Sequence, residues 1–172
     1  MLNQQAADAY LAGKTLRPAD LLQTYEKFSG FGLPLYITEV TIPATLAPGA
    51  EGERMQAEVV ANLYRLWFSV PKMAGIIYWN LPDGAAWKQE GLVKGGLLDE
   101  DFREKPAYQA LYQLINREWR TSLGQQSDER GEVKLRGFYG KYSVTVRQGE
   151  VVKTFSVDLT PGGASGHRLA LP

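Results

Sequence analysis

The residue with the clearest chemical potential is Glu39, a carboxylate inside an apolar and β-branched run over residues 33–42. Because this run scarcely alternates between apolar and polar residues, it predicts a strand buried on both faces, as in a parallel sheet. A carboxylate there costs several kcal/mol unless it is paired or hydrogen-bonded. Catalytic groups lie at the carboxyl ends of parallel strands. Glu39 is therefore a candidate catalytic residue, and a strand-end glutamate that reaches solvent or an arginine is the alternative.

More candidates follow the next apolar run, residues 73–79. Trp79 ends this run, and Asn80, Asp83 and Trp87 lie in the segment after it. Two indoles can stack on the flat faces of sugars, with Asp83 binding hydroxyl groups. Two core tryptophans and a turn aspartate are the alternative. Together with Glu39, these residues favour a carbohydrate site that needs no metal, nucleotide or other cofactor.

Helices and strands must position these residues. Apolar periodicity predicts helices over residues 6–11, 18–28 and about 53–69, and another from Pro106 onward. The strand at 33–42, the helix at 53–69 and the strand at 73–79 predict a βαβ unit of a parallel sheet. The expected inward residues are Met55, Val59, Leu63, Leu66 and Trp67 in the third helix, and Tyr108, Leu111, Tyr112 and Ile115 in the fourth.

The C-terminal part of the chain has a different pattern. Residues 122–130 are polar and predict a linker, and from residue 131 the apolar residues recur with period two. Gln148 and Gly149 lie between two such runs and suit a tight hairpin. This part is expected to be a small antiparallel β module that either binds sugar or packs on the rest of the protein.

Composition excludes several classes of function. The chain has 172 residues, 44% hydrophobic and 22% charged, which excludes a disordered or collagen-like protein. Nineteen Lys and Arg balance nineteen Asp and Glu, so no overall positive field favours nucleic acid. The absence of cysteine and the single histidine exclude disulfides, thiol nucleophiles and multi-histidine metal sites. No apolar run is long enough to predict a membrane span.

Three segments carry a resemblance to glycoside hydrolase family 10, the endo-β-1,4-xylanases. Residues 32–39 resemble its seventh strand, where the Glu of an I-T-E-[LFV]-D motif is the nucleophile. Residues 77–87 are similar to the eighth-strand W-G-x-x-D-x-x-x-W segment, and residues 96–108 resemble the closing L-L-F-D-x-x-x-x-P-K-P-A-Y signature. The order and spacing agree over about residues 15–115. Thr41 and Asn80 depart from the pattern, because the family has Asp and Gly at these places.

The resemblance implies an α/β fold, the C-terminal portion of a (β/α)8 TIM barrel. Residues 1–121 would be this partial barrel with strands seven and eight, 122–130 a linker, and 131–172 a small β-sandwich-like module. A whole barrel takes about 250 residues, so strands one to six and the strand-four acid/base glutamate are expected to be missing. The missing N-terminal barrel half, or a second copy of the chain, would cover the exposed strands. The family also implies an extracellular location.

The activity implied by the resemblance is hydrolysis of β-1,4-xylan with retention. Glu39 would be the nucleophile, and Trp79, Trp87, Asp83 and Asn80 would bind the substrate. Asp83 could in principle supply the second carboxyl group, but the family offers no precedent for that role. Without the acid/base the chain is expected to be poorly active or inactive. The alternative function is a catalytically inactive carbohydrate-binding or structural remnant.

Overall fold

The computed structural model describes residues 9, 12–14, 17–164 and 166–171. The chain divides into two compact units, residues 1–115 and residues 116–172, called unit 1 and unit 2 below. The helix predicted over residues 6–11 lies outside the described residues, except for Ala9. Among the described helices, none has both the length and the apolar character that crossing a membrane requires.

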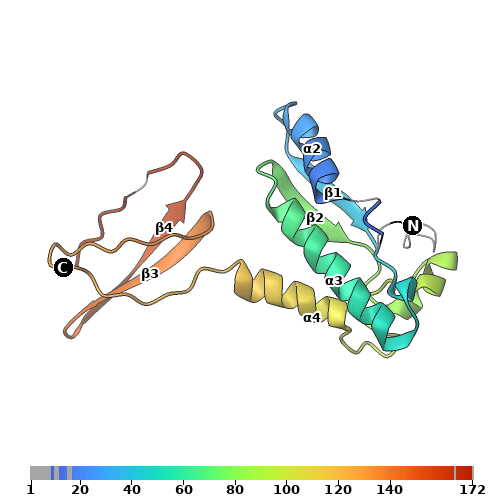
Figure 1. The fold of residues 1–172 in the computed structure, drawn as a ribbon. Helices are drawn as coiled ribbons and strands as arrows, with labels where there is room; N and C mark the ends of the chain where they lie inside the picture. Colours follow the sequence, from blue (N-terminus) through green and yellow to red (C-terminus); the bar gives the residue numbers. More distant parts are fainter. Residues whose placement is uncertain (1–8, 10–11, 15–16, 165, 172) are drawn as a thin grey trace. The chain divides into compact units, whose positions relative to one another are not determined.

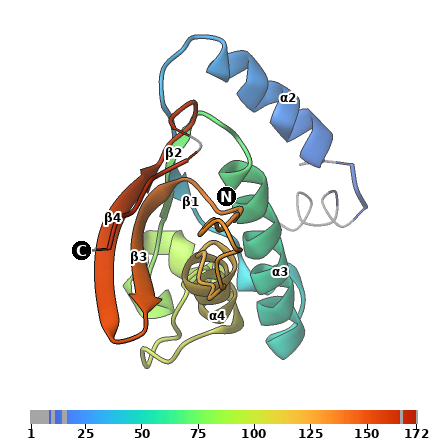
Figure 2. The same ribbon diagram turned by 90° about the vertical axis from the view of Figure 1, so that its left-hand side faces the viewer.

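Unit 1 is built on two parallel strands joined by a long helix (Figure 1). These elements are β1 (Leu35–Val40), α3 (Gly49–Phe68) and β2 (Met73–Tyr78). The strands pair in parallel from Leu35–Met73 to Val40–Tyr78. Figures 1 and 2 both show α3 running alongside the two strands. The predicted βαβ unit is confirmed, with β1 shorter than the predicted run.

The core of unit 1 lies where α3 meets α4 (Pro106–Gln113). In α3, Val59, Leu63 and Trp67 are buried as predicted, whereas Met55 and Leu66 are only half-buried. The stripe predicted for the fourth helix is wrong in part, because Tyr112 and Ile115 are 41% and 48% exposed. The side chains that α4 and the turn after it bury are Ala107, Leu111 and Leu114.

The helix α2 (Pro18–Ser29) buries no residue completely. Pro18 starts the helix, where its missing N–H leaves no bond unmade. The helix is joined to α3 by a hydrogen bond of 2.8 Å from the Trp67 indole N–H to the Tyr25 hydroxyl. Its outer face keeps Leu22 and Phe28 41% and 51% exposed.

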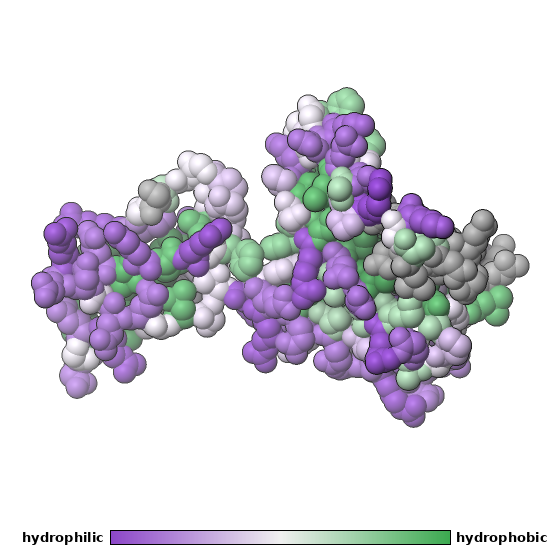
Figure 3. Space-filling model, viewed as in Figure 1, coloured by the Kyte–Doolittle hydropathy of each residue, from purple (hydrophilic) through white to green (hydrophobic). Residues whose placement is uncertain are grey.

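The strands of unit 1 are not buried on both faces, and exposed strands are what a partial barrel is expected to have. Neither β1 nor β2 contains a fully buried residue. The side chains away from α3 include Tyr36 and Ile77, which are 57% and 53% exposed. Figure 3 shows hydrophobic residues, in green, reaching the surface of this unit near α2 and the strands. In the described residues this sheet has two strands, so helix α3 covers one face and the other face stays open.

Unit 2 contains the hairpin β3 (Gly140–Gln148) and β4 (Val151–Leu159). The strands are antiparallel and end on the pair Gln148–Val151. Gly149 opens the two-residue loop with φ +55°, a conformation that favours glycine. Within the described residues this is the one sheet of unit 2, and residues 131–137 lie outside it.

Candidate active site

An irregularity in β1 exposes Glu39. Between the pairs Ile37–Ile76 and Val40–Tyr78, β1 has one residue more than β2, so a bulge lies at Thr38 and Glu39. A regular strand would place Glu39 on the same face as Leu35 and Ile37, the face toward α3. The extra residue instead keeps Val40 half-buried and leaves Thr38 and Glu39 exposed. Bulges of this kind re-aim side chains beside active sites.

The carboxylate of Glu39 is therefore open to a ligand. It has no hydrogen-bond or ion-pair partner in the part of the chain that the structure describes. Because solvent hydrates the Glu39 carboxylate here, it does not bear the desolvation cost that it would have in a strand buried on both faces.

Trp79 lies beside Glu39 at the carboxyl ends of the two strands. Its backbone N–H donates a hydrogen bond of 2.8 Å to the Val40 carbonyl, one residue after Glu39. The Trp79 side chain is 46% exposed. The second indole, Trp87, is 69% exposed and follows the short helix η2 (Asp83–Ala85). Both tryptophans are thus on the surface, and the alternative of two core tryptophans is not what the structure shows.

The two residues that depart from the family pattern contact each other. Asn80 has φ 71°, a left-handed conformation that glycine adopts easily and that asparagine tolerates best among other residues. Its Nδ2 donates to the Thr41 Oγ1 at 3.4 Å, and that hydroxyl donates to the Trp79 carbonyl at 3.0 Å. The position therefore demands positive φ, and the Thr41–Asn80 pair joins the end of β1 to the end of β2.

Asp83 does not lie in this exposed group. It is 6% exposed, and its Oδ1 and Oδ2 lie 3.1 and 3.0 Å from the Lys105 Nζ. The Gly96 N–H donates a further bond of 2.7 Å to Oδ1. With its oxygens engaged and buried, Asp83 is not placed to bind sugar hydroxyls, and this geometry corrects the prediction that it binds substrate. The same geometry also speaks against Asp83 as the second carboxyl group, a role for which the family offers no precedent.

Sequence reasoning missed Gln56, which is 0% exposed on α3. Its Nε2 donates to the carbonyls of Ile42 at 2.8 Å and Gly96 at 3.1 Å. The Tyr78 hydroxyl donates to the adjacent Gly95 carbonyl at 2.7 Å. These bonds fix the segment after β1 and the Gly95–Gly96 segment to α3 and β2. The sequence did contain a signal for Gln56, because this polar residue falls three residues before Val59, on the apolar face of the predicted helix.

We expect Tyr78 to make the protein less stable at alkaline pH. Burial raises its pKa from 10.0 to about 12, although the Ile42 N–H and the Gln56 amide favour the phenolate. Between these values the unfolded chain loses the phenol proton and the folded chain keeps it, so stability falls as pH rises from 10 toward 12. The loss should approach about 2–3 kcal/mol.

Urea denaturation at pH 9, 10.5 and 12 checks this expectation by comparing the unchanged chain with Tyr78→Phe. The stability difference between the two should shrink as pH rises, because phenylalanine has no proton to lose. The exposed change Tyr36→Phe serves as the control and should leave the pH dependence as it is. A difference that stays constant up to pH 12 would contradict the expectation.

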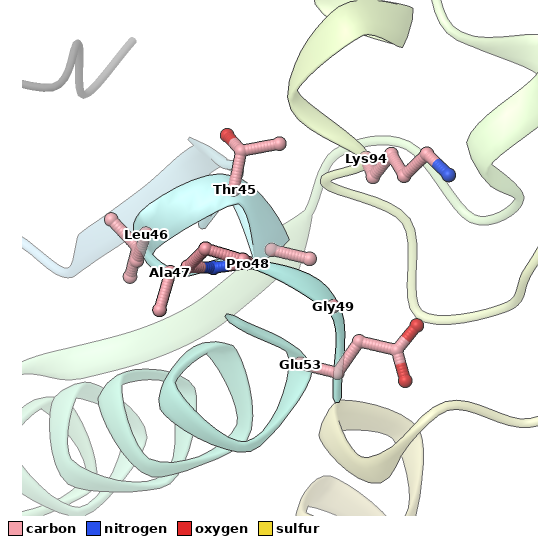
Figure 4. A pocket seen from close by; sticks show the side chains of 8 residues that line it. Thr45, Leu46, Ala47, Pro48, Gly49, Glu53 and Lys94 are labelled. Atoms are coloured by element: carbon pink, nitrogen blue, oxygen red, sulfur yellow. The ribbon is translucent and has the colours of Figure 1, made fainter. Parts of the chain in front are cut away.

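A hollow of about 460 Å³ lies beyond the end of β1 (Figure 4). One side is formed by the short helix η1 (Ala44–Leu46) and the start of α3. Thr45, Glu53 and Lys94 contribute polar side chains from η1, α3 and the turn after η3 (Lys88–Val93). The first residue that lines the hollow, Ala44, follows the last residue of β1, Val40, by four positions in the sequence.

Glu39 and Trp79 are both exposed at the carboxyl ends of two paired parallel strands, which is where (β/α)8 barrels carry their catalytic residues. Residues 8–114 match the model of glycosyl hydrolase family 10, and the chain belongs to this family.

Two curated relatives are similar to part of this chain. The anti-sigma-I factor RsgI6 of Acetivibrio thermocellus is 31% identical over 121 residues, which cover 70% of this chain and 15% of that protein. Endo-1,4-beta-xylanase B of Thermotoga neapolitana is 30% identical over 95 residues, covering 52% of this chain and 27% of the enzyme. The chain thus spans a small part of each.

Two solved xylanase structures are similar in fold to part of this chain. Xylanase 10B of Thermotoga petrophila, solved with xylobiose, is 28% identical with a TM-score of 0.51. Native xylanase 10B of Thermotoga maritima is 30% identical, also with a TM-score of 0.51. In both cases the similarity covers 60% of this chain and 33% of the xylanase. The parallel strands of unit 1 are therefore consistent with part of a xylanase barrel.

Proposed function

We propose that this chain carries the nucleophile half of a retaining glycoside hydrolase that acts on β-1,4-xylan. In this proposal β1 and β2 correspond to strands seven and eight of a (β/α)8 barrel. The observation that carries it is the bulge that exposes Glu39 next to Trp79 at the strand ends. The xylanases to which the chain is similar support xylan as the substrate class.

In the proposed reaction a Glu39 oxygen attacks the anomeric carbon of a xylose unit. The bond from this carbon to the leaving oxygen breaks, and the leaving group takes the electron pair. Trp79 and Trp87 would stack on the sugar rings, and Asn80 would lie at the edge of the same site through its contact with Thr41.

A retaining enzyme also needs an acid about 5–5.5 Å from the nucleophile to protonate the leaving oxygen. Asp83 is held by Lys105 and Gly96, so we propose that this acid comes from another part of the barrel. The same barrel part, or a second copy of the chain, would cover the open face that carries Tyr36 and Ile77.

Covalent trapping tests this function, because a good leaving group needs little protonation. The full chain is incubated with the 2,4-dinitrophenyl glycoside of 2-fluoro-xylobiose and examined by mass spectrometry. We expect one fluoroxylobiosyl group on Glu39, and none on the Glu39→Gln variant. Glu53→Gln, which changes a carboxylate on the nearby helix α3, should be labelled like the unchanged chain. A label on another carboxylate would contradict Glu39 as nucleophile.

A second candidate is sugar binding without turnover. The observation that favours it is the similarity to RsgI6, which is named an anti-sigma-I factor. Its site would be the same exposed indoles. A chain that binds xylotetraose, keeps its circular dichroism spectrum and takes up no label would support this function over hydrolysis.

A further inference from the structure

A buried ion pair joins two segments that are far apart in the sequence. Asp83 and Lys105 have side chains 5% and 3% exposed, and the Lys105 Nζ lies 3.0 Å from Oδ2. The remaining hydrogen-bonding groups of the pair are also used, since Nζ donates to the Lys94 carbonyl at 2.8 Å and Oδ1 accepts the Gly96 N–H. This set of contacts is called the Asp83–Lys105 pair below.

The pair connects the tryptophan segment to the core. Asp83 begins η2, between Asn80 and Trp87, whereas Lys105 immediately precedes α4, which packs on α3. Backbone hydrogen bonds of Asp83 and Lys105 hold the same two segments together. The Asp83 N–H donates to the Leu98 carbonyl at 3.0 Å, and the Lys105 N–H donates to the Leu97 carbonyl at 3.0 Å.

The fit around the pair is tight. A Cβ at Gly96 would lie 2.8 Å from Asp83 Oδ1 and 2.6 Å from the Asp83 backbone nitrogen. The Gly96 carbonyl in turn accepts a hydrogen bond from Gln56, which also binds the Ile42 carbonyl beyond Glu39. A continuous set of buried bonds therefore connects the segment that carries Trp79 and Trp87 with the end of the Glu39 strand.

Stability alone is a weak reason for such a pair. Desolvating two charges offsets most of their attraction, and a buried pair can often be replaced by apolar side chains without loss of stability. A buried ion pair can instead favour one conformation of the chain over others. This pair lies between the tryptophan segment and the core, where it would fix the conformation of that segment.

We infer that Asp83 and Lys105 are positioning residues that hold the tryptophan segment, residues 79–87, in place for β-1,4-linked xylose units. The inference rests on the proposed function for the identity of the sugar. It gives Asp83 an indirect role in substrate binding, through the position of Trp79 and Trp87, and no direct contact with sugar.

The first experiment separates position from stability with full-length variants. The single change Asp83→Asn leaves Lys105 buried without its charge partner, so it should lower the melting temperature. The double change Asp83→Leu with Lys105→Met removes both charges and should restore the melting temperature. Xylotetraose affinity, measured by tryptophan fluorescence, should nevertheless stay at least tenfold weaker in the double variant than in the unchanged chain.

An exposed ion pair shortly before Lys105 in the sequence gives the matched control. Asp101 and Arg103 are 2.8 Å apart, with side chains 66% and 73% exposed. The double change Asp101→Leu with Arg103→Met should alter neither the melting temperature nor the affinity. If the Asp83→Leu, Lys105→Met variant is as stable as the unchanged chain and binds xylotetraose equally well, the pair does not position the site and the inference is overturned.

Hydrogen exchange on the unchanged chain tests the inference without any variant or sugar. The amides of Gly96, Leu97 and Lys105 donate to Asp83, Leu81 and Leu97, and they should be protected to the level of amides within α3. Exchange as fast as that of the α2 amides would overturn the inference. Should the unchanged chain fail to bind xylotetraose, the proposed function fails, and the exchange result still decides whether the pair holds the segment.

Discussion

Replacing Gly52 with alanine should destabilise the protein by about 3 kcal/mol, at the upper end of overpacking effects. Gly52 lies in the first turn of α3 and is buried. A Cβ at this position would lie 1.8 Å from the Ala44 carbonyl oxygen and 2.2 Å from that of Ala47. Both are backbone atoms, which cannot move aside as a flexible side chain can. Alanine improves helix propensity by about 1 kcal/mol, and the clash outweighs this gain.

Urea denaturation followed by circular dichroism measures this effect. Gly91→Ala is the matched control, because a Cβ there would meet nothing within 4 Å. We expect the control to stay within about 0.5 kcal/mol of the unchanged chain. Equal stabilities for the two variants would mean that α3 does not pack directly on the backbone of η1.

The parallel βαβ unit could be predicted because its signals are local. An unbroken apolar run predicts a strand, and apolar residues three and four apart predict one buried face of a helix. The bulge at Glu39 could not be predicted in this way. A bulge is a property of the pairing between two strands, and the sequence of β1 alone does not say where β2 has one residue fewer.

Long-range partners explain most other differences. The sequence shows Asp83 in a polar loop, where a carboxylate usually faces solvent or a ligand. Its actual partner, Lys105, is 22 residues away, and only the fold brings the two together. In α4, Tyr108 and Tyr112 stack on each other with ring centroids 6.4 Å apart. Ala107 is buried in α4, whereas Tyr112, which was predicted to face inward, is 41% exposed.

The exposed tryptophans show the reverse case. Aromatic residues in an apolar run are usually core residues, and the spacing of Trp79 and Trp87 does not exclude that interpretation. Their association with a strand-end glutamate indicated a sugar site instead, and the structure exposes both indoles. Their roles in binding stay a prediction that the xylotetraose titration tests.

The other large effect is expected at Gln56, where the change to leucine should destabilise the protein by about 2–3 kcal/mol. Leucine is similar in size but cannot donate to the carbonyls of Ile42 and Gly96, which Gln56 now binds at 2.8 and 3.1 Å. Each buried carbonyl left without a donor costs about 1–3 kcal/mol. Part of this cost is recovered, because the Gln56 Oε1 has no partner among the described residues and would be removed.

Gln113→Leu, an exposed change on α4, is the control and should remain within about 0.5 kcal/mol of the unchanged chain. Urea denaturation gives the stability of both variants. Under conditions where it is fully folded, Gln56→Leu should also weaken xylotetraose binding, because Gln56 holds the Ile42 carbonyl after the Glu39 strand and the Gly96 segment that binds Asp83. A folded Gln56→Leu protein with unchanged stability and affinity would show that the bonds of Gln56 neither stabilise unit 1 nor hold the glutamate strand and the tryptophan segment together.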